Sequence, residues 1–151
     1  MPPSISVHSR TASGNTPPLR VITGPNTQLN WPASIAVESA RGEIFVANDG
    51  GNSILVFRVT DQGNVAPTRV IKGPNTGISN PIGVSLDTLN NEVWVSNFGS
   101  HSVTVYPLAA DGDTAPLRTI RAAPLGKKAL GIGNPGGVAY DSKRKEILVP
   151  N

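Results

Sequence analysis

Apolar and polar positions alternate over short segments along the whole chain, with the two-residue period of a β-strand that has one buried face. These segments are rich in β-branched residues, which pack well on a pleated sheet, and turn-forming stretches such as Asp49-Gly50-Gly51-Asn52 separate them. In one representative stretch the expected strands are 33–38, 43–48, 53–58 and 68–72. No segment shows a convincing helical period. The pattern therefore predicts an all-β fold.

The same pattern recurs with a fixed spacing of 49 residues. Pro18-Leu19-Arg20-Val21-Ile22 returns as Pro67-Thr68-Arg69-Val70-Ile71 and again as Pro116-Leu117-Arg118-Thr119-Ile120. The segment 43–48 is repeated at 92–97 and, after five extra residues within 122–133, at 146–151. Four strands in a repeat of this length are typical of one blade of a β-propeller.

The sequence resembles the NHL and YVTN families of propeller repeats. The resemblance rests on Pro-x-Gly-Val-x-x-Asp at 81–87 and 135–141, followed by Glu-Val-Trp-Val-Ser-Asn at 92–97 and Ser-Val-Thr-Val-Tyr at 102–106. The first copy departs from the motif, with Ser34 at the Gly position and Glu38 at the Asp position. The resemblance implies that Gly-Val-x-x-Asp forms the innermost strand and that six blades are a common ring size. It leaves the activity open, because these families include ligand-binding, scaffold and enzymatic members.

In this frame the chain is a single propeller segment with three blade equivalents, two of them complete. Its parts are 4–22, the two outer strands of a shared blade; 33–72, a blade; 82–121, a blade; and 136–151, the two inner strands of a shared blade. Propellers have typically four to eight blades, and open half-blades leave unpaired strand edges. We therefore expect a homodimer in which two chains exchange half-blades to form one six-bladed ring. The rival hypothesis is that residues 1–151 belong to a longer chain that supplies the other blades itself.

Composition and charge exclude several classes of protein. The chain has no cysteine, which excludes a disulfide framework, a thiolate metal site and a cysteine nucleophile. No apolar run reaches the length of a membrane span, and Met1-Pro2-Pro3-Ser4 lacks the pattern of a signal peptide. We expect no membrane partner, and the cellular compartment stays open.

The net charge of +3 is concentrated at the C-terminal end of the chain. Residues 118–151 hold seven basic and two acidic side chains, and Lys127-Lys128 and Lys143-Arg144-Lys145 supply most of the excess. Proteins that bind nucleic acids usually have broader basic stripes, with aromatic residues on which bases stack. We therefore interpret these stretches as solvated loops and expect no nucleic-acid partner.

Asparagine recurs at the strand ends that should surround the mouth of the propeller channel. One set of three asparagines (Asn30, Asn80, Asn134) lies before the inner strands, and another (Asn48, Asn97, Asn151) ends the second strands. In a dimer, each set would become a ring of six amides suited to a small polar ligand. The alternative is that asparagine is present because it suits the backbone conformation of turns. Trp31 is the expected exposed aromatic anchor, and Asp49 and His101 lie in the same loops. The candidate ligand-binding residues are Asn30, Trp31, Asn48, Asp49, Asn80, Asn97, His101, Asn134 and Asn151.

The leading functional hypothesis is a non-catalytic binding or scaffold module for a peptide, a partner protein or a glycan. No nucleophile–base or acid–base pair is identifiable, and no cofactor or metal ligand is assigned. The family resemblance allows an alternative, because lactonase-type propellers hold Ca²⁺ in the channel; the nearby acid here is Asp49, while Glu38, Asp87 and Asp141 lie towards the opposite face. A third hypothesis is a shortened or engineered propeller fragment that retains no activity.

Overall fold

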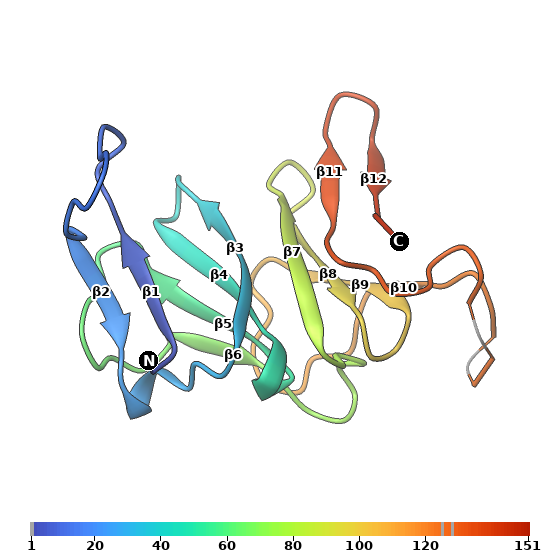
Figure 1. The fold of residues 1–151 in the computed structure, drawn as a ribbon. Coiled ribbons are helices and arrows are strands. Elements are labelled where there is room, and N and C mark those ends of the chain that lie inside the picture. The colour runs from blue at the N-terminus through green and yellow to red at the C-terminus, as the bar shows by residue number, and fades with distance from the viewer. Residues whose placement is uncertain (1, 125, 128) are drawn as a thin grey trace.

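The computed structural model describes residues 2–124, 126–127 and 129–151, and these residues form an all-β fold. Lys128, part of one basic stretch noted above, lies outside the described residues. Two four-stranded antiparallel sheets are flanked by two two-stranded ones (Figure 1). The strands in chain order are β1 (Ser4–Val7), β2 (Arg20–Thr23), β3 (Pro32–Glu38), β4 (Glu43–Asn48), β5 (Ser53–Arg58), β6 (Arg69–Ile71), β7 (Pro81–Asp87), β8 (Glu92–Asn97), β9 (Ser102–Pro107), β10 (Arg118–Ile120), β11 (Ala139–Asp141) and β12 (Glu146–Leu148).

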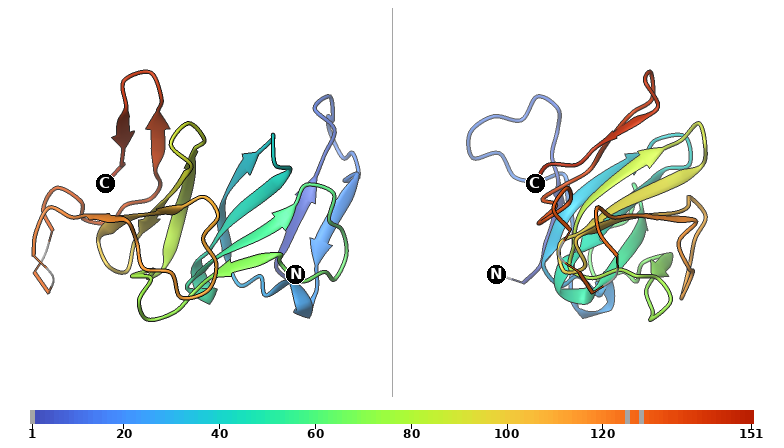
Figure 2. Two further views of the ribbon diagram at one scale, coloured as in Figure 1. Left: turned by 180° about the vertical axis from the view of Figure 1, so that it is seen from behind. Right: turned by 90° about the vertical axis from the view of Figure 1, so that its right-hand side faces the viewer.

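The four sheets follow one another in chain order, with β1–β2 and β11–β12 at opposite ends (Figures 1 and 2). Two short 3-10 turns, η1 (Pro25–Thr27) and η2 (Asp49–Gly51), lie at the same ends of the strands. The β3–β4 and β7–β8 turns lie at the other ends. Within the described residues, no helix is long and apolar enough to cross a membrane.

The strand boundaries follow the local sequence closely. The expected strands 43–48 and 53–58 form β4 and β5, and the expected strands 33–38 and 68–72 differ from β3 and β6 by one residue at one end or at both. The inner strands β3 and β7 both begin at a proline, where the missing N–H is tolerated. Their pairing shifts register between Pro32 and Ser34 in β3 and between Pro81 and Gly83 in β7. The last pair of strands is shorter than the expected segment 136–151, since β11 begins only at Ala139.

The largest apolar core lies between the two four-stranded sheets. Phe45 and Val56 from one sheet and Val95 and Tyr106 from the other are fully buried in it. The Tyr106 hydroxyl donates to the carbonyl of Thr76 at 2.6 Å, and burial raises the pKa of this tyrosine to about 12. A smaller core joins β1–β2 to the β3–β6 sheet.

Backbone hydrogen bonds also connect each outer strand to the next sheet. The N–H of Gly63 donates to Val21 at 2.7 Å, and the N–H of Gly112 donates to Val70 at 2.8 Å. Both glycines have positive φ, 70° and 64°, a conformation that glycine adopts without steric cost. The sheets are therefore joined by backbone contacts as well as by packing.

Gly83 of β7 lies against Gly137, in the segment that precedes β11, and replacing Gly83 by alanine is expected to destabilise the protein. A Cβ here would come within 2.6 Å of both the Gly137 Cα and the Ser96 Oγ. Since backbone must move to relieve the contact, Gly83→Ala is expected to lower the free energy of unfolding by about 2 kcal/mol in urea denaturation. Gly136→Ala is the control, because its Cβ would meet nothing within 4 Å. Equal stability of the two variants would contradict the prediction.

Candidate functional site

The amides of Asn48 and Asn97 are buried at the ends of β4 and β8. The Oδ1 of Asn48 accepts a hydrogen bond from the N–H of Asn30 at 2.7 Å. The Oδ1 of Asn97 accepts from the N–H of Ser79 at 3.2 Å, while its Nδ2 donates to Thr104 Oγ1 at 2.9 Å. Both amides thus fasten the segment before an inner strand to the sheet. This geometry supports the turn-building alternative at these two positions.

Asp49 and Asn80 lie together on the surface at the same end of the strands. The Nδ2 of Asn80 donates to Asp49 Oδ1 at 3.0 Å, and the N–H of Asn80 donates to Asn52 Oδ1 at 2.7 Å. The exposed Asn30 donates through Nδ2 to the carbonyl of Gly50 at 3.0 Å. These contacts place Asn30, Asp49 and Asn80 on one polar surface around η2.

Trp31 adjoins this surface, with 75% of its area exposed. Its carbonyl accepts a hydrogen bond from the N–H of Asp49 at 3.1 Å. Its φ is 52°, in the left-handed region, and Asn80 has φ 46° at the equivalent position of the next repeat. Asparagine tolerates this conformation better than a bulky residue does. The sequence therefore accepts a backbone cost at Trp31 and presents an aromatic ring to solvent.

The remaining three candidate residues, His101, Asn134 and Asn151, gather around Gly133. Nδ1 of His101 is hydrogen-bonded to the carbonyl of Gly133, and the N–H of Gly133 donates to Asn151 Oδ1 at 2.5 Å. Asn134 and Asn151 line a shallow hollow of about 400 Å³ beside Leu130. The structure thus places the nine candidates in three groups rather than in one site: two buried amides, one surface around η2 and one around Gly133.

The acids at the opposite ends of the strands stabilise turns. Burial alone would raise the pKa of the Asp87 carboxyl. Hydrogen bonds from the side chain and backbone of Asn90, and from the backbone N–H of Leu89, instead hold this pKa below its usual value. The Arg144 side chain donates to Asp141 and likewise lowers the pKa of that carboxyl. Among the described residues, no group of three or more His, Cys, Asp or Glu is placed to hold a metal ion.

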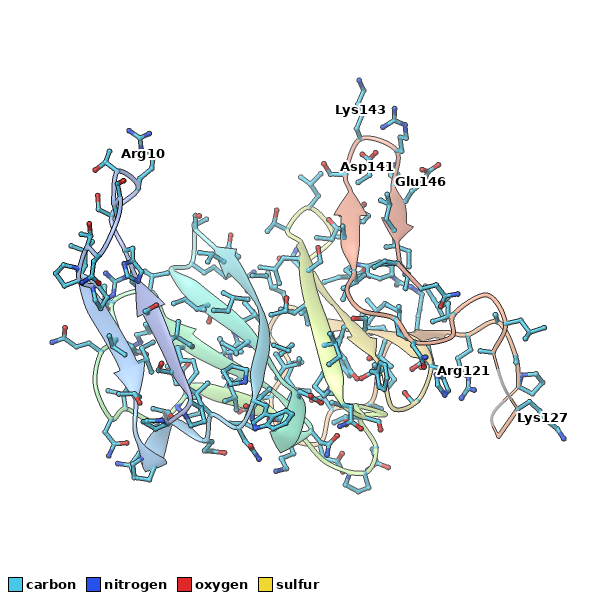
Figure 3. All side chains as sticks on the ribbon, viewed as in Figure 1. Arg10, Arg121, Lys127, Asp141, Lys143 and Glu146 are labelled. Atoms are coloured by element: carbon cyan, nitrogen blue, oxygen red, sulfur yellow. The ribbon has the colours of Figure 1, made fainter. Side chains whose placement is uncertain are left out.

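Two of the described strands have an unpaired edge where the equivalent strand of a four-stranded sheet is paired on both sides. β1 pairs with β2 alone, and β12 pairs with β11 alone. On β2, the Nε of Arg20 is buried without a hydrogen-bond partner among the described residues, although its Nη2 donates to the carbonyl of Val59. On β12, the exposed Glu146 projects from the edge strand (Figure 3).

Within the four-stranded sheets, the corresponding arginines and glutamates are paired. Arg69 and Glu43 form an ion pair at 2.7 Å, and Arg118 and Glu92 form a two-pronged one with a closest approach of 2.7 Å. The hydrogen bond to Glu92 raises the pKa of the Arg118 guanidinium against the opposing effect of burial. Each ion pair therefore ties an outer strand to the second strand of its own sheet.

A groove at the other ends of the strands from η2 was not anticipated from the sequence. Its volume is about 470 Å³, and it lies at the β3–β4 turn and the β5–β6 connection. The residues that line it are Arg41, Gly42, Glu43, Arg58, Val59, Thr60, Thr68 and Arg69. The sequence does contain a signal, because four of these residues are not kept in the following repeat. There, 49 residues later, Asn90, Pro107, Ala109 and Leu117 stand in place of Arg41, Arg58, Thr60 and Thr68. Comparing the repeats for differences, instead of for shared residues, would have found it.

No family model and no curated protein matches the chain by sequence. Solved structures do resemble it. The hydrazine synthase of Kuenenia stuttgartiensis matches with a TM-score of 0.59 at 19% identity, over 84% of this chain and 31% of that chain. A "putative 6-phosphogluconolactonase" from Bacteroides uniformis matches with a TM-score of 0.56 at 17% identity, over 88% and 38%. The WD40 β-propeller domain of Doa1 has a TM-score of 0.48 at 15% identity, over 78% and 33%.

These likenesses concern the fold alone, because the sequence identities are low. The four-stranded antiparallel sheets and the structural neighbours are those of a β-propeller. The chain spans about a third of the length of the solved proteins that it matches. Membership of the NHL or YVTN family stays a prediction.

Proposed function

We propose that this chain is a non-catalytic β-propeller module that assembles as a homodimer, with each copy supplying half of a six-bladed ring. β11 and β12 of one copy join β1 and β2 of the other, in the order β11-β12-β1-β2, to complete a four-stranded sheet. Twofold symmetry forms the reciprocal sheet, so two hybrid blades complete the ring with two intact blades from each copy. The free edges of β1 and β12 support this assembly.

The observation that carries the proposal concerns Arg20 and Glu146, two residues whose equivalents form an ion pair in the intact sheet. Arg20 occupies the repeat position of Arg69, and Glu146 occupies the position of Glu43. In the intact sheet the equivalent pair is 2.7 Å apart. In a single copy, Arg20 and Glu146 lie on the sheets at opposite ends of the row of sheets, and the Arg20 Nε has no hydrogen-bond partner in the part of the chain that the structure describes. A hybrid sheet brings the two charges to the same relative position as Arg69 and Glu43.

The intact interface between the four-stranded sheets shows how neighbouring blades pack. Ala36 and Phe45 of one sheet belong to the same apolar cluster as Val84 and Leu86 of the next. The first pair lies on β3 and β4, and the second lies on β7. Packing therefore requires the two inner strands of one blade and the innermost strand of the following blade.

Both surfaces of that contact occur a second time in the chain: one on β3, and the other on β11 and β12. Ile35 and Val37 occupy the positions of Val84 and Leu86, and they are 47% and 52% exposed. Ala139 and Leu148 occupy the positions of Ala36 and Phe45, and Leu148 is 55% exposed. The two exposed surfaces are complementary halves of a contact that the chain already makes once. A second copy covers both.

The surface around η2 is the proposed contact surface for a peptide, a protein or a glycan. Trp31 gives it an exposed aromatic ring, and Asn30, Asp49 and Asn80 add hydrogen-bonding groups to the same surface. Aromatic rings bordered by polar groups are common at binding surfaces. Twofold symmetry presents the surface twice on one ring, which suits a scaffold.

Sedimentation equilibrium at micromolar concentration tests the assembly. The expected result is one species of twice the chain mass of 15.7 kDa, stable to dilution because free strand edges and apolar faces are buried together. A species of 15.7 kDa alone would contradict the proposal and would favour the rival hypothesis, in which a longer chain supplies the remaining blades.

A further inference from the structure

We propose that the groove at the β3–β4 turn and the β5–β6 connection binds a phosphoryl group, free or carried by a small molecule, through the guanidinium groups of Arg41 and Arg58. The groove lies where the two four-stranded sheets meet, because its residues reach the neighbouring sheet: Arg41 donates to Asn91, and Arg69 donates to Leu108. Every residue that lines it comes from one copy of the chain, so the site exists independently of the proposed dimer.

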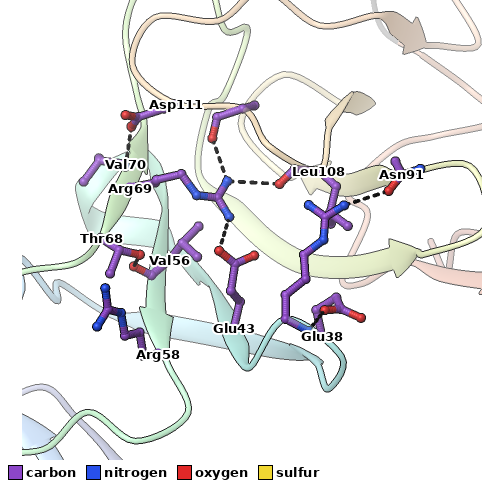
Figure 4. Close-up of polar contacts among 12 residues, drawn as sticks. Glu38, Glu43, Val56, Arg58, Thr68, Arg69, Val70, Asn91, Leu108 and Asp111 are labelled. Atoms are coloured by element: carbon purple, nitrogen blue, oxygen red, sulfur yellow. Dashed lines mark hydrogen bonds and ion pairs between the residues drawn. The ribbon is translucent and has the colours of Figure 1, made fainter.

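The floor of the groove is a rigid and internally neutral pair (Figure 4). Arg69 donates to Glu43 at 2.7 Å and to the carbonyls of Leu108 and Ala110 at 3.0 Å each. The guanidinium also lies over the Phe45 ring, 5.5 Å from its centroid. These contacts use the charge and most of the donors of Arg69, so this arginine shapes the site and leaves ligand binding to its neighbours.

Two positive charges at the groove remain without a neutralising side chain. The Nη2 of Arg41 donates at 2.9 Å to the amide oxygen of Asn91, which is uncharged. The Arg58 guanidinium has no hydrogen-bond or ion-pair partner among the residues that the structure describes. Three arginines and one glutamate, Glu43, line the groove. Glu38 and Asp61 lie outside the lining, where their carboxylates accept hydrogen bonds from the backbone N–H groups of Arg41 and Arg58. The groove therefore has a net positive character.

The combination of both cations occurs in one blade. The third copy has Arg144 at the position of Arg41, but that arginine is paired with Asp141, and Ser9 stands at the position of Arg58 in the first copy. In the following repeat the positions of Arg41 and Arg58 hold Asn90 and Pro107, whereas Arg69 is matched by Arg118. That repeat still folds as a four-stranded sheet, so the blade does not require Arg41 and Arg58 for its construction. Residues shared by the repeats build the blade, and residues that differ and converge on one groove are candidates for binding.

The chemistry favours a phosphoryl group over a carboxylate. Two guanidinium groups together offer a fan of N–H donors and two positive charges, which match a tetrahedral dianion with three acceptor oxygens. The exposed Thr60 adds a hydroxyl at the groove wall. The volume of about 470 Å³ also leaves room for an organic group beside the phosphoryl group, since small-molecule sites span roughly 300–1,000 Å³.

Calorimetric titration at constant ionic strength tests this site with three probes: inorganic phosphate, glucose 6-phosphate and glucuronate. We expect glucose 6-phosphate to bind once per chain and glucuronate to bind at least tenfold more weakly. Arg41→Gln and Arg58→Gln should each weaken phosphate-ester binding by about tenfold or more, because each removes a charge-assisted hydrogen bond. Lys72→Gln is the matched control, since it removes one charge from the same sheet but not from the groove. Both arginines are exposed, and unfolding curves of the variants show whether the fold is retained.

Equal affinity for phosphate and glucose 6-phosphate would support recognition of the phosphoryl group alone, and a higher affinity for the ester would support a contact with the organic part as well. The proposal is overturned if neither phosphate probe binds, if glucuronate binds as tightly as the ester, or if Lys72→Gln weakens binding as much as the arginine variants. Because the titration and the sedimentation experiment measure different properties, either proposal can fail alone.

Discussion

Replacing Arg20 by glutamate is expected to convert the proposed dimer into monomers. The change places two carboxylates opposite each other in each hybrid sheet, where Arg20 of one copy should meet Glu146 of the other. Losing one member of a partly buried charge pair costs about 2–5 kcal/mol, and the dimer has two such junctions. The dissociation constant should therefore rise by about a thousandfold or more. Sedimentation across a dilution series measures this change.

The reciprocal variant and the double variant make the test specific. Glu146→Arg alone should dissociate the dimer through repulsion between arginines, and Arg20→Glu combined with Glu146→Arg should restore it, because opposite charges face each other again. Arg69→Glu is the control, since it breaks the equivalent ion pair inside one chain and should lower stability without dissociating the dimer. A double variant as monomeric as the single variants would rule out this pairing.

The fold could be predicted from the sequence because its determinants are local. β4 and β5 are expected to lie between strong turn formers, and the Pro-x-Gly-Val start of β7 recurs at 135–138, directly before β11, so strand order follows from repetition. The shortened β11 could not be predicted, because residues 135–138 repeat the sequence pattern that begins β7 and yet lie outside the strand.

The candidate site could be predicted only in part, because a residue type does not reveal the direction of its side chain. Asn48 and Asn80 both fall at strand ends on the same face, yet the amide of Asn48 is buried and that of Asn80 is exposed. The difference arises from the backbone, since Asn80 adopts a left-handed φ of 46° before Pro81. The arginine groove escaped prediction for another reason: Arg41 and Arg58 lie 17 residues apart in the sequence, and only the fold places both in the lining of one groove.

The asparagines that end the second strand of each sheet are expected to contribute stability, and Asn97 offers the clearest measurement. Its side chain is fully buried and bonds the N–H of Ser79 and the hydroxyl of Thr104. Asn97→Ala leaves the N–H of Ser79 without its acceptor, and a buried unsatisfied group costs about 1–3 kcal/mol. The change also removes the hydrogen bonds that the amide donates to Thr104 and to the carbonyl of Val95, although the Thr104 hydroxyl keeps the bond from Tyr106. We therefore expect the free energy of unfolding in urea to fall by about 2–5 kcal/mol.

Asn80→Ala is the matched comparison, because this asparagine is exposed and, among the described residues, its side chain makes one hydrogen bond, to Asp49 at 3.0 Å. Its loss should cost about 1 kcal/mol, through the surface hydrogen bond and the poorer fit of alanine to a positive φ. A loss of stability for Asn80→Ala that equals the loss for Asn97→Ala would contradict the division between buried amides that build the sheets and exposed amides that remain available to a ligand. The expected ordering instead leaves the surface around Trp31 and Asn80 open to substitution, so that variants there report on binding rather than on folding.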